Sequence, residues 1–511
     1  MKGKWISLML ALALVAVAFA AFPAPRVLAA TKTWDGGAGT SNWSDASNWN
    51  DDVVPASTDS VVLDNSLLAG SYSVNLPGGA VTVAIVKLTI SPAGVNTITL
   101  TLPSSNTNAP GFNVGDNTAA TDDIVLDSGA ILINSSGAGS GNGIQANSTS
   151  NGTVRINNGA KYVHNTARST AGVIPLLSTA SGTELGLFEY DVPGTSAFAI
   201  SASGRTFGSL TLTRTAGAAT YTASGGSALT IRGHFTLNTG ITFNSTMTAA
   251  LNLGGNLVNN GAALTFASSQ AVNLNGTSAQ SVSGSGAITF SSLSLNNAAG
   301  ATLGRDVTVS TSLALTSGDI TTGANTLTLA EAVTTSGNGD VWGNVKRTGT
   351  LVTTKTYSFG NPDVSLNFAS GTVPTDVTVN IAQSQPSAFT YAVTRSYTIT
   401  PNGGSGYAAT VRLHYLESEL NGNTESTLVL WRYDGSQWLN MGQSSRDSTN
   451  NWVEQSGITT FSPWAISSFT PTAVTLRSLA AHSPARPWAA ALPLLGLMAV
   501  GGAALRRGRG R

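Results

Sequence analysis

Short apolar–polar–apolar triplets recur along the middle of the chain. Each predicts a short strand with two side chains facing inward and one facing outward. One such unit cannot bury its own apolar face, so the units must stack, and the pattern predicts a β-solenoid. The triplets are Leu210-Thr211-Leu212, Phe235-Thr236-Leu237, Leu251-Asn252-Leu253, Val272-Asn273-Leu274, Leu293-Ser294-Leu295, Leu313-Ala314-Leu315 and Leu327-Thr328-Leu329. Their first residues are 25, 16, 21, 21, 20 and 14 positions apart, an average near 19.5.

Turn-forming residues follow the triplets, as in Asn296-Asn297 and Ser317-Gly318-Asp319. Strands of the same kind begin near Val74 and continue to about Val345. The stretch from Leu176 to Tyr190 is less regular and predicts a protruding loop. We therefore expect a parallel β-helix over residues 31–345, and an array of β-sandwiches is the alternative.

The pattern changes after Lys346, where the strands lengthen and aromatic residues concentrate. The segment from Trp431 to Trp438 predicts a hairpin with Asp434-Gly435 at its turn. Seven or so strands in residues 346–469 are typical of an antiparallel β-sandwich. Residues 470–487 predict an extended linker.

Segments at both ends of the chain predict where the protein is located in the cell. Residues 1–30 combine a basic start, an apolar run from Ile6 to Phe22 and small residues near Ala29, which is typical of a secretory signal peptide. Residues 488–505 form an uncharged stretch long enough to cross a membrane as a helix. The basic tail, residues 506–511, holds four arginines that would stay on the cytoplasmic side.

Composition narrows the function classes. Only 10% of the 511 residues are charged, 56 are glycine and none is cysteine, so disulfides and thiolate metal sites are excluded. Three of the 25 basic residues lie in the signal and four in the tail, so residues 31–505 carry 18 basic and 25 acidic residues, a net charge of −7. A mildly acidic exterior argues against nucleic acid as a partner.

Three segments resemble parts of exported bacterial proteins. The start of the mature chain, with Trp34, Trp43 and Trp49 ahead of an Asp-x-Val strand, resembles the opening of β-helical surface proteins, including autotransporter-like adhesins. Residues 293–329 resemble repeats of large exported proteins, which implies a right-handed parallel β-helix of the pectate-lyase type. Residues 395–467 resemble a module that precedes C-terminal sorting tails. The apolar stretch of residues 488–505 resembles the helix of such a tail, although no Pro-Glu-Pro motif precedes it.

The three tryptophans have two interpretations. They could form an exposed platform on which sugars stack. Alternatively, they could cover the open end of the solenoid core, since the first coil has no neighbour on one side. The second interpretation is favoured.

Carboxylates that could catalyse polysaccharide cleavage are sparse. Hydrolases need two carboxylates about 5 to 10 Å apart, and lyases need a basic residue beside an acidic calcium cluster. Asp122, Asp123 and Asp127 flank a single strand and read as turn residues. Glu189 and Asp191 share one strand face but have no basic residue nearby in the sequence.

Metal sites are also weakly indicated. His164, His234, His414 and His482 show no metal-ligand spacing, and His414 is expected to face outward from a strand. The best candidate is a calcium site at Glu417, Glu419, Asn421 and Asn423, where oxygen donors alternate around Gly422. A solvated turn is the alternative explanation of that loop.

The sequence favours a cell-envelope surface protein with a structural or adhesive role and no cofactor. Its tail would be either a permanent transmembrane anchor or a sorting signal that is removed. Expected partners are envelope or extracellular glycans or other surface proteins. The alternatives are a polysaccharide lyase or glycoside hydrolase, or a carbohydrate-binding protein, acting on the flank of the β-helix.

Overall fold

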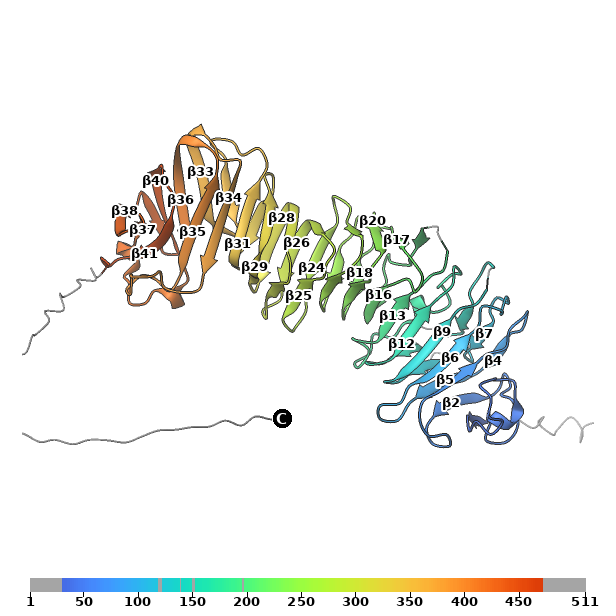
Figure 1. Ribbon diagram of the computed structural model, residues 1–511. Helices are drawn as coiled ribbons and strands as arrows, with labels where there is room; N and C mark the ends of the chain where they lie inside the picture. Colours follow the sequence, from blue (N-terminus) through green and yellow to red (C-terminus); the bar gives the residue numbers. More distant parts are fainter. Residues whose placement is uncertain (1–29, 118–121, 138, 149–151, 195–196, 472–511) are drawn as a thin grey trace, which may run out of the picture. The chain divides into compact units, whose positions relative to one another are not determined.

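The computed structural model describes residues 30–117, 122–137, 139–148, 152–194 and 197–471. Over these residues the chain is all-β, with a β-solenoid of about 12 turns followed by antiparallel strands (Figure 1). The only helical pieces described are 3-10 turns: η1 (Ala46–Asn48), η2 (Ile174–Leu176), η3 (Glu417–Glu419) and η4 (Glu425–Thr427). The expected parallel β-helix is thus confirmed.

Three parallel sheets form the flanks of the first coils. One contains β1 (Thr31–Thr33), β2 (Ser60–Asp64), β5 (Lys87–Ser91), β8 (Ile124–Leu126) and β11 (Val154–Ile156). A second contains β4 (Val83–Ile85), β7 (Phe112–Val114) and β10 (Ile144–Ala146). The third begins with β3 (Tyr72–Asn75), β6 (Ile98–Leu102), β9 (Ala130–Asn134), β12 (Lys161–His164) and β13 (Leu187–Tyr190). Since β13 pairs with strands on both sides, this part of the expected loop is a solenoid strand.

The later coils repeat the arrangement. One column of strands is β15 (Thr206–Phe207), β18 (Leu229–Ile231), β21 (Leu251–Leu253), β24 (Ala271–Leu274), the end of β26 (Ile288–Asn296), the end of β28 (Val307–Ser317) and β30 (Thr334–Gly337). The next is β16 (Ser209–Leu212), β19 (Phe235–Leu237), β22 (Leu257–Asn259), β25 (Gln280–Ser283), β27 (Ala301–Leu303) and β29 (Ile320–Ala330). On the third flank, β14 (Phe198–Ala199), β17 (Ala219–Ala223), β20 (Ile241–Ser245) and β23 (Ala263–Thr265) pair in sequence.

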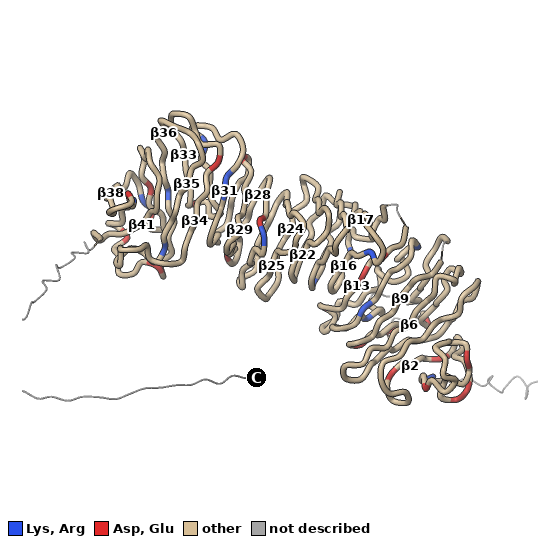
Figure 2. The backbone as a smooth tube through the Cα atoms, viewed as in Figure 1, with Lys and Arg blue, Asp and Glu red and all other residues tan. Residues whose placement is uncertain are grey.

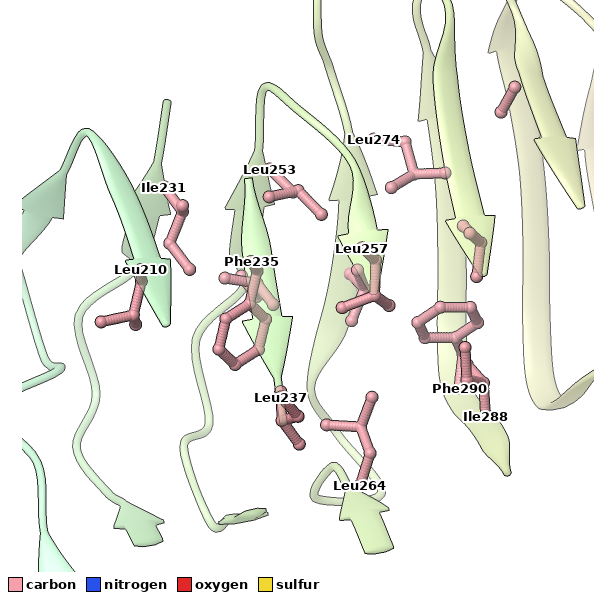
Figure 3. Close-up of a cluster of buried hydrophobic side chains, with 14 of the residues drawn as sticks. Leu210, Ile231, Phe235, Leu237, Leu253, Leu257, Leu264, Leu274, Ile288 and Phe290 are labelled. Carbon is pink, nitrogen blue, oxygen red and sulfur yellow. The ribbon is translucent and has the colours of Figure 1, made fainter. Parts of the chain in front are cut away.

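Register places like side chains above one another inside the coils. Leu253 pairs with Leu274, Leu274 with Leu295, and Leu295 with Leu315, and all four are fully buried. Figure 3 shows Leu253 and Leu274 on successive coils, with Phe235 and Leu257 facing the same interior. The core is therefore a set of aligned apolar columns.

Every triplet predicted from the sequence is a strand segment, but the triplets do not lie on one flank. Those of β21, β24, β26 and β28 stack directly, whereas Leu210 and Phe235 belong to the neighbouring column and Leu327 stacks on Val307. Register partners such as Leu210 and Phe235 are 25 residues apart, and Leu293 and Leu313 are 20 apart. The irregular spacings of 16 and 14 residues in the sequence arise where the series changes flank.

The turns depend on glycine where successive coils approach closely. Gly318, between β28 and β29, has a φ of +79°, and an added Cβ would lie 2.0 Å from the carbonyl oxygen of Asn297 in the coil below. Only glycine fits this position. Residues 235–304, from β19 to β27, contain no Asp, Glu, Lys or Arg, which Figure 2 shows as an unbroken tan stretch. These coils are held by core packing, backbone hydrogen bonds and hydrogen bonds of uncharged side chains, such as the one from the Asn273 amide to Asn252 Oδ1.

The first coil is covered by tryptophans. Trp34, Trp43 and Trp49 are at most 1% exposed, and the ring centroids of Trp34 and Trp43 lie 5.1 and 4.7 Å from that of Trp49. The Trp49 indole donates a hydrogen bond of 2.9 Å to the Trp43 carbonyl. Rings this buried cannot stack on a sugar, so the structure supports their interpretation as a cover for the core.

The last coil continues into antiparallel structure through one shared strand. β31 (Val341–Thr348) pairs in parallel with β29 and antiparallel with β34 (Asp376–Ala382). The sheet goes on through β35 (Ser396–Asn402), β41 (Pro463–Ser467), β37 (Val429–Tyr433) and β38 (Trp438–Gly442). A second antiparallel sheet contains β32 (Thr356–Phe359), β33 (Asn361–Thr372), β36 (Ser405–His414), β40 (Trp452–Ile458) and β39 (Ser445–Asp447). Val379 and Trp464 of the first sheet share one core cluster with Phe368 and Val411 of the second.

Two details of this C-terminal region follow the sequence. The expected hairpin is present, because β37 pairs antiparallel with β38 and Tyr433 faces Trp438 across the Asp434-Gly435 turn. Two antiparallel sheets with a shared core are also the layers that a β-sandwich requires.

Candidate functional site

The structure separates the first group of candidate acids. Asp122 lies 3.9 Å from Arg155, and Asp127 accepts a hydrogen bond of 2.7 Å from Asn157. Asp123 lies in a bend directly before β8, as the sequence predicts, and is only 1% exposed. Burial disfavours its charged form and raises the pKa of Asp123 to about 6.

Glu189 and Asp191 have separate structural partners. The Glu189 carboxylate lies 3.4 Å from Lys161 Nζ on the neighbouring strand β12, a basic partner that sequence proximity did not reveal. Asp191 is buried and accepts hydrogen bonds from the Asn165 amide and from the backbone N–H and hydroxyl of Thr215. Each carboxylate therefore links adjacent coils.

The histidines lie in different environments. His164 is fully buried, with Nε2 3.0 Å from the Arg168 carbonyl oxygen, and burial lowers the pKa of His164 to about 4. His234 is exposed and its Nδ1 accepts a hydrogen bond from the Asn256 N–H. His414 is 7% exposed, so the expectation that it faces outward is wrong. His482 lies outside the described residues.

The loop expected to bind calcium has most of its polar groups bonded within the protein. Glu417 is exposed, whereas both carboxylate oxygens of Glu419 accept hydrogen bonds from Arg395, at 2.8 and 3.2 Å. Asn421 donates to the carbonyls of Thr390 and Ala392. Asn423 donates to the Tyr391 carbonyl, and its oxygen accepts from Ser467 and Ser468. Within the described part of the chain, no group of three or more His, Asp or Glu residues could hold a metal ion. The calcium site stays a prediction.

Glu419 belongs instead to a buried charge network where the last coil meets the antiparallel strands. Arg395, just before β35, is completely buried and donates to Asp340 Oδ2 at 2.8 Å as well as to Glu419. Its guanidinium lies 4.5 Å from the centroid of the Trp342 ring. Asp340 comes from the last coil, directly before β31. The network therefore connects the solenoid with the C-terminal strands by charge.

His414 completes this network. Its Nδ1 lies 3.4 Å from Asp340 Oδ1 and 3.3 Å from Arg395 Nη1, so it can donate to the carboxylate or accept from the guanidinium, but not both. Burial opposes the charge of Asp340, but the hydrogen bond from His414 and the charge of Arg395 override it and lower the pKa of Asp340. Burial also opposes the charge of Arg395, but neighbouring Tyr397 and Asp340 raise the pKa of Arg395.

A surface hollow opens beside this network. We call it the junction hollow; it has a volume of about 250 Å³ and is lined by Gly337, Asn338, Asn361, Asp363, His414, Leu416, Thr449, Asn450 and Asn451. These residues come from the end of β30, the start of β33, the end of β36 and the turn between β39 and β40. His414, which engages the charge network through Nδ1, also lines the hollow.

No family model, curated protein or solved structure matches this chain. Among the residues that the structure describes, no helix is long and apolar enough to cross a membrane. The predicted anchor, residues 488–505, lies outside the described residues, and so does the predicted signal peptide except for Ala30. The junction hollow and its charge network form a polar site within the described residues.

The raised pKa of Asp123 predicts a pH-dependent loss of stability. The folded protein holds this proton more tightly than the unfolded chain, whose pKa is near 3.8. The stability that the protonated Asp123 gives the folded protein is therefore fully present below about pH 4. It is lost as the pH rises through about 6. Asp123→Asn should stabilise the protein at pH 8 by at most about 3 kcal/mol and change little at pH 4.

Urea unfolding of the parent and of Asp123→Asn between pH 4 and pH 8 measures this difference. Asp127→Asn serves as the matched control, because it also removes one carboxylate next to β8 but at a half-buried position. Parallel stability profiles for the parent and Asp123→Asn would show that folding does not raise the pKa of Asp123.

Proposed function

We propose that this chain is a cell-envelope surface protein with a structural or adhesive role and no catalytic activity. It would be exported by its signal peptide and held by residues 488–505, either as a transmembrane helix or until a sorting protease removes them. Its partners would be envelope or extracellular glycans or other surface proteins. The observation that carries the proposal is a solenoid whose apolar core is covered at both ends, by tryptophans at the first coil and by β34 at the last.

The polar groups support a scaffold rather than an enzyme. Glu189 pairs with Lys161, and Asp191 ties β13 to the following coil through Thr215. Acids placed in this way hold coils together, so neither Glu189 nor Asp191 is a free carboxylate facing a substrate. A stiff repeat of this kind suits a protein that presents its flank or its end to other molecules.

Two finer points belong to the same proposal. We infer that the coils wind with a right hand, because connections between parallel strands of one sheet are right-handed in about 98% of cases. We also infer that the two C-terminal sheets pack as a β-sandwich that precedes the linker at residues 470–487. Calcium at Glu417, Glu419, Asn421 and Asn423 would be a structural ion of that sandwich.

Cell fractionation tests the address. Deleting residues 484–511 should release the protein into the medium, and replacing the four arginines of residues 506–511 should impair retention or orientation. Protease added to intact cells should cut first between residues 470 and 487. Recovery of the full-length chain from the cytoplasm with its signal uncleaved would overturn the proposal. Cleavage of a polysaccharide that is abolished by Glu189→Ala would overturn its non-catalytic part.

A further inference from the structure

We propose that the junction hollow binds one ring of a neutral polyhydroxylated ligand, a single sugar unit of a glycan. The inference rests on the proposed adhesive role and deepens it by naming a site and a ligand class. The site joins the last coil to the second antiparallel sheet, so it depends on both parts of the described chain.

The size of the hollow limits the ligand. Its volume of about 250 Å³ lies below the roughly 300–1,000 Å³ of pockets that hold drug-sized molecules. One six-membered ring with its hydroxyl groups is an appropriate occupant, whereas a longer chain would have to continue outside. The hollow would therefore hold one terminal or branching unit of a larger glycan.

The lining favours hydroxyl groups. Four asparagines, one threonine, one aspartate and one histidine line the hollow, beside a single leucine. Amides offer donors and acceptors side by side, as sugar hydroxyls do. Asn338 and Thr449 are exposed at its rim. The lining thus provides both kinds of hydrogen-bonding group that a hydroxylated ring needs.

One buried oxygen in the lining lacks a hydrogen bond. Asn451 Oδ1 has no hydrogen-bond partner within the described residues, and Asn451 lines the hollow. A buried acceptor without a donor is costly, so a rotation of this amide toward a ligand hydroxyl would be favoured.

Charges at the site argue against an anion. Arg395 is occupied by Asp340 and Glu419, and Arg412 lies 3.2 Å from Asp363 and 3.0 Å from Glu454. Each arginine thus serves two carboxylates, so neither is free to pair with a phosphate or a carboxylate ligand. Because Asp340 and Asp363 are themselves paired, a neutral ligand fits better than an ammonium group, which would compete with the arginines.

The walls of the hollow are fixed before any ligand binds. Asn451 holds a φ of +56°, and its carbonyl accepts a hydrogen bond of 2.8 Å from the Tyr415 N–H. Asn361 donates to the Gly339 carbonyl and accepts from the Asp363 N–H at 2.8 Å. His414 is held by Asp340 and Arg395. Groups that are already oriented lose little freedom on binding, which favours recognition of a small ligand.

Saturation-transfer NMR and calorimetry on the purified full-length protein test the site. The probes are the methyl glycosides of glucose, galactose, mannose and N-acetylglucosamine, with inorganic phosphate and methylammonium as charged probes. Asn451→Gly removes the buried amide and keeps the positive φ, and Asn338→Trp fills the hollow from its rim. Asn296→Ala, at an exposed position of the solenoid, is the matched control.

At least one glycoside should bind, and both hollow variants should weaken it about tenfold or more, as expected when a buried hydrogen bond or the space for the ring is lost. Asn296→Ala should bind like the parent. Circular dichroism confirms that each variant is folded. Binding of phosphate or methylammonium alone, or glycoside binding that neither hollow variant weakens, would overturn the inference. Absence of glycoside binding from a protein that is still retained at the cell surface would refute the site and leave the proposed address intact.

Discussion

Replacing Arg395 with methionine is expected to destabilise the region where the last coil meets the antiparallel strands by about 3–5 kcal/mol, because it leaves two buried carboxylates without a counter-charge. Arg395 is 0% exposed, and its partners Asp340 and Glu419 are 2% and 9% exposed. The methionine chain has a similar length, so the packing beside Trp342 is largely kept. The expected loss is therefore electrostatic.

Hydrogen exchange of β31 and β34, together with urea unfolding, measures the effect. The triple variant Arg395→Met, Asp340→Asn, Glu419→Gln removes all three charges and should recover part of the lost stability, since replacing a whole buried ion cluster is often neutral. Arg432→Met is the control for loss of an arginine that is partly exposed. Unchanged protection of β31 in Arg395→Met would contradict a structural role for the network.

Leu295→Asp is expected to destabilise the solenoid by several kcal/mol, because its carboxylate would enter a column of leucines that offers no partner. Leu295 is fully buried between Leu274 and Leu315 in register. Leu313→Ala, in the same strand column, should cost about 2–5 kcal/mol through the cavity that it leaves.

Ser294→Asp is the matched control for Leu295→Asp. Ser294 precedes Leu295 on the same strand and its side chain faces outward, so a charge there remains hydrated. Thermal unfolding followed by circular dichroism should show a lower transition for Leu295→Asp and Leu313→Ala and a near-parental one for Ser294→Asp. If Leu295→Asp and Leu313→Ala both melted like the parent, these leucines would not belong to the core.

The repeat was predictable because it depends only on the alternation of apolar and polar residues within each short strand. A triplet such as Leu293-Ser294-Leu295 places two side chains inward whatever flank it occupies, and the burial pattern follows that alternation. Which flank each triplet joins depends on turn lengths, and these vary from coil to coil. The distribution of the triplets over the flanks was therefore not predictable. The covering role of the tryptophans was predictable because an end coil has no neighbour on one side, so its apolar core must be covered by other residues.

The polar sites were not predictable from local pattern. Asp340 and Arg395 are 55 residues apart, and nothing near Asp340 in the sequence signals a buried partner. The sequence predicts Glu419 as a calcium ligand because neighbouring side chains also carry oxygens. Its carboxylate instead accepts hydrogen bonds from Arg395, which lies in a distant segment. His414 and Asp123 sit in strands or at their edges, where alternation alone cannot tell a buried charge from an exposed one.

The stacking register also bears on how the chain folds. Each solenoid strand pairs with one that precedes it by a single coil, as Leu253 does with Ile231, 22 residues earlier. Contacts this close in sequence give a long all-β chain a low relative contact order, which favours fast folding. The tryptophan-covered coil lies nearest the N-terminus, so a chain that crosses a membrane N-terminus first could complete its coils one after another as they emerge. The antiparallel strands would then assemble last, on the free edge of β31.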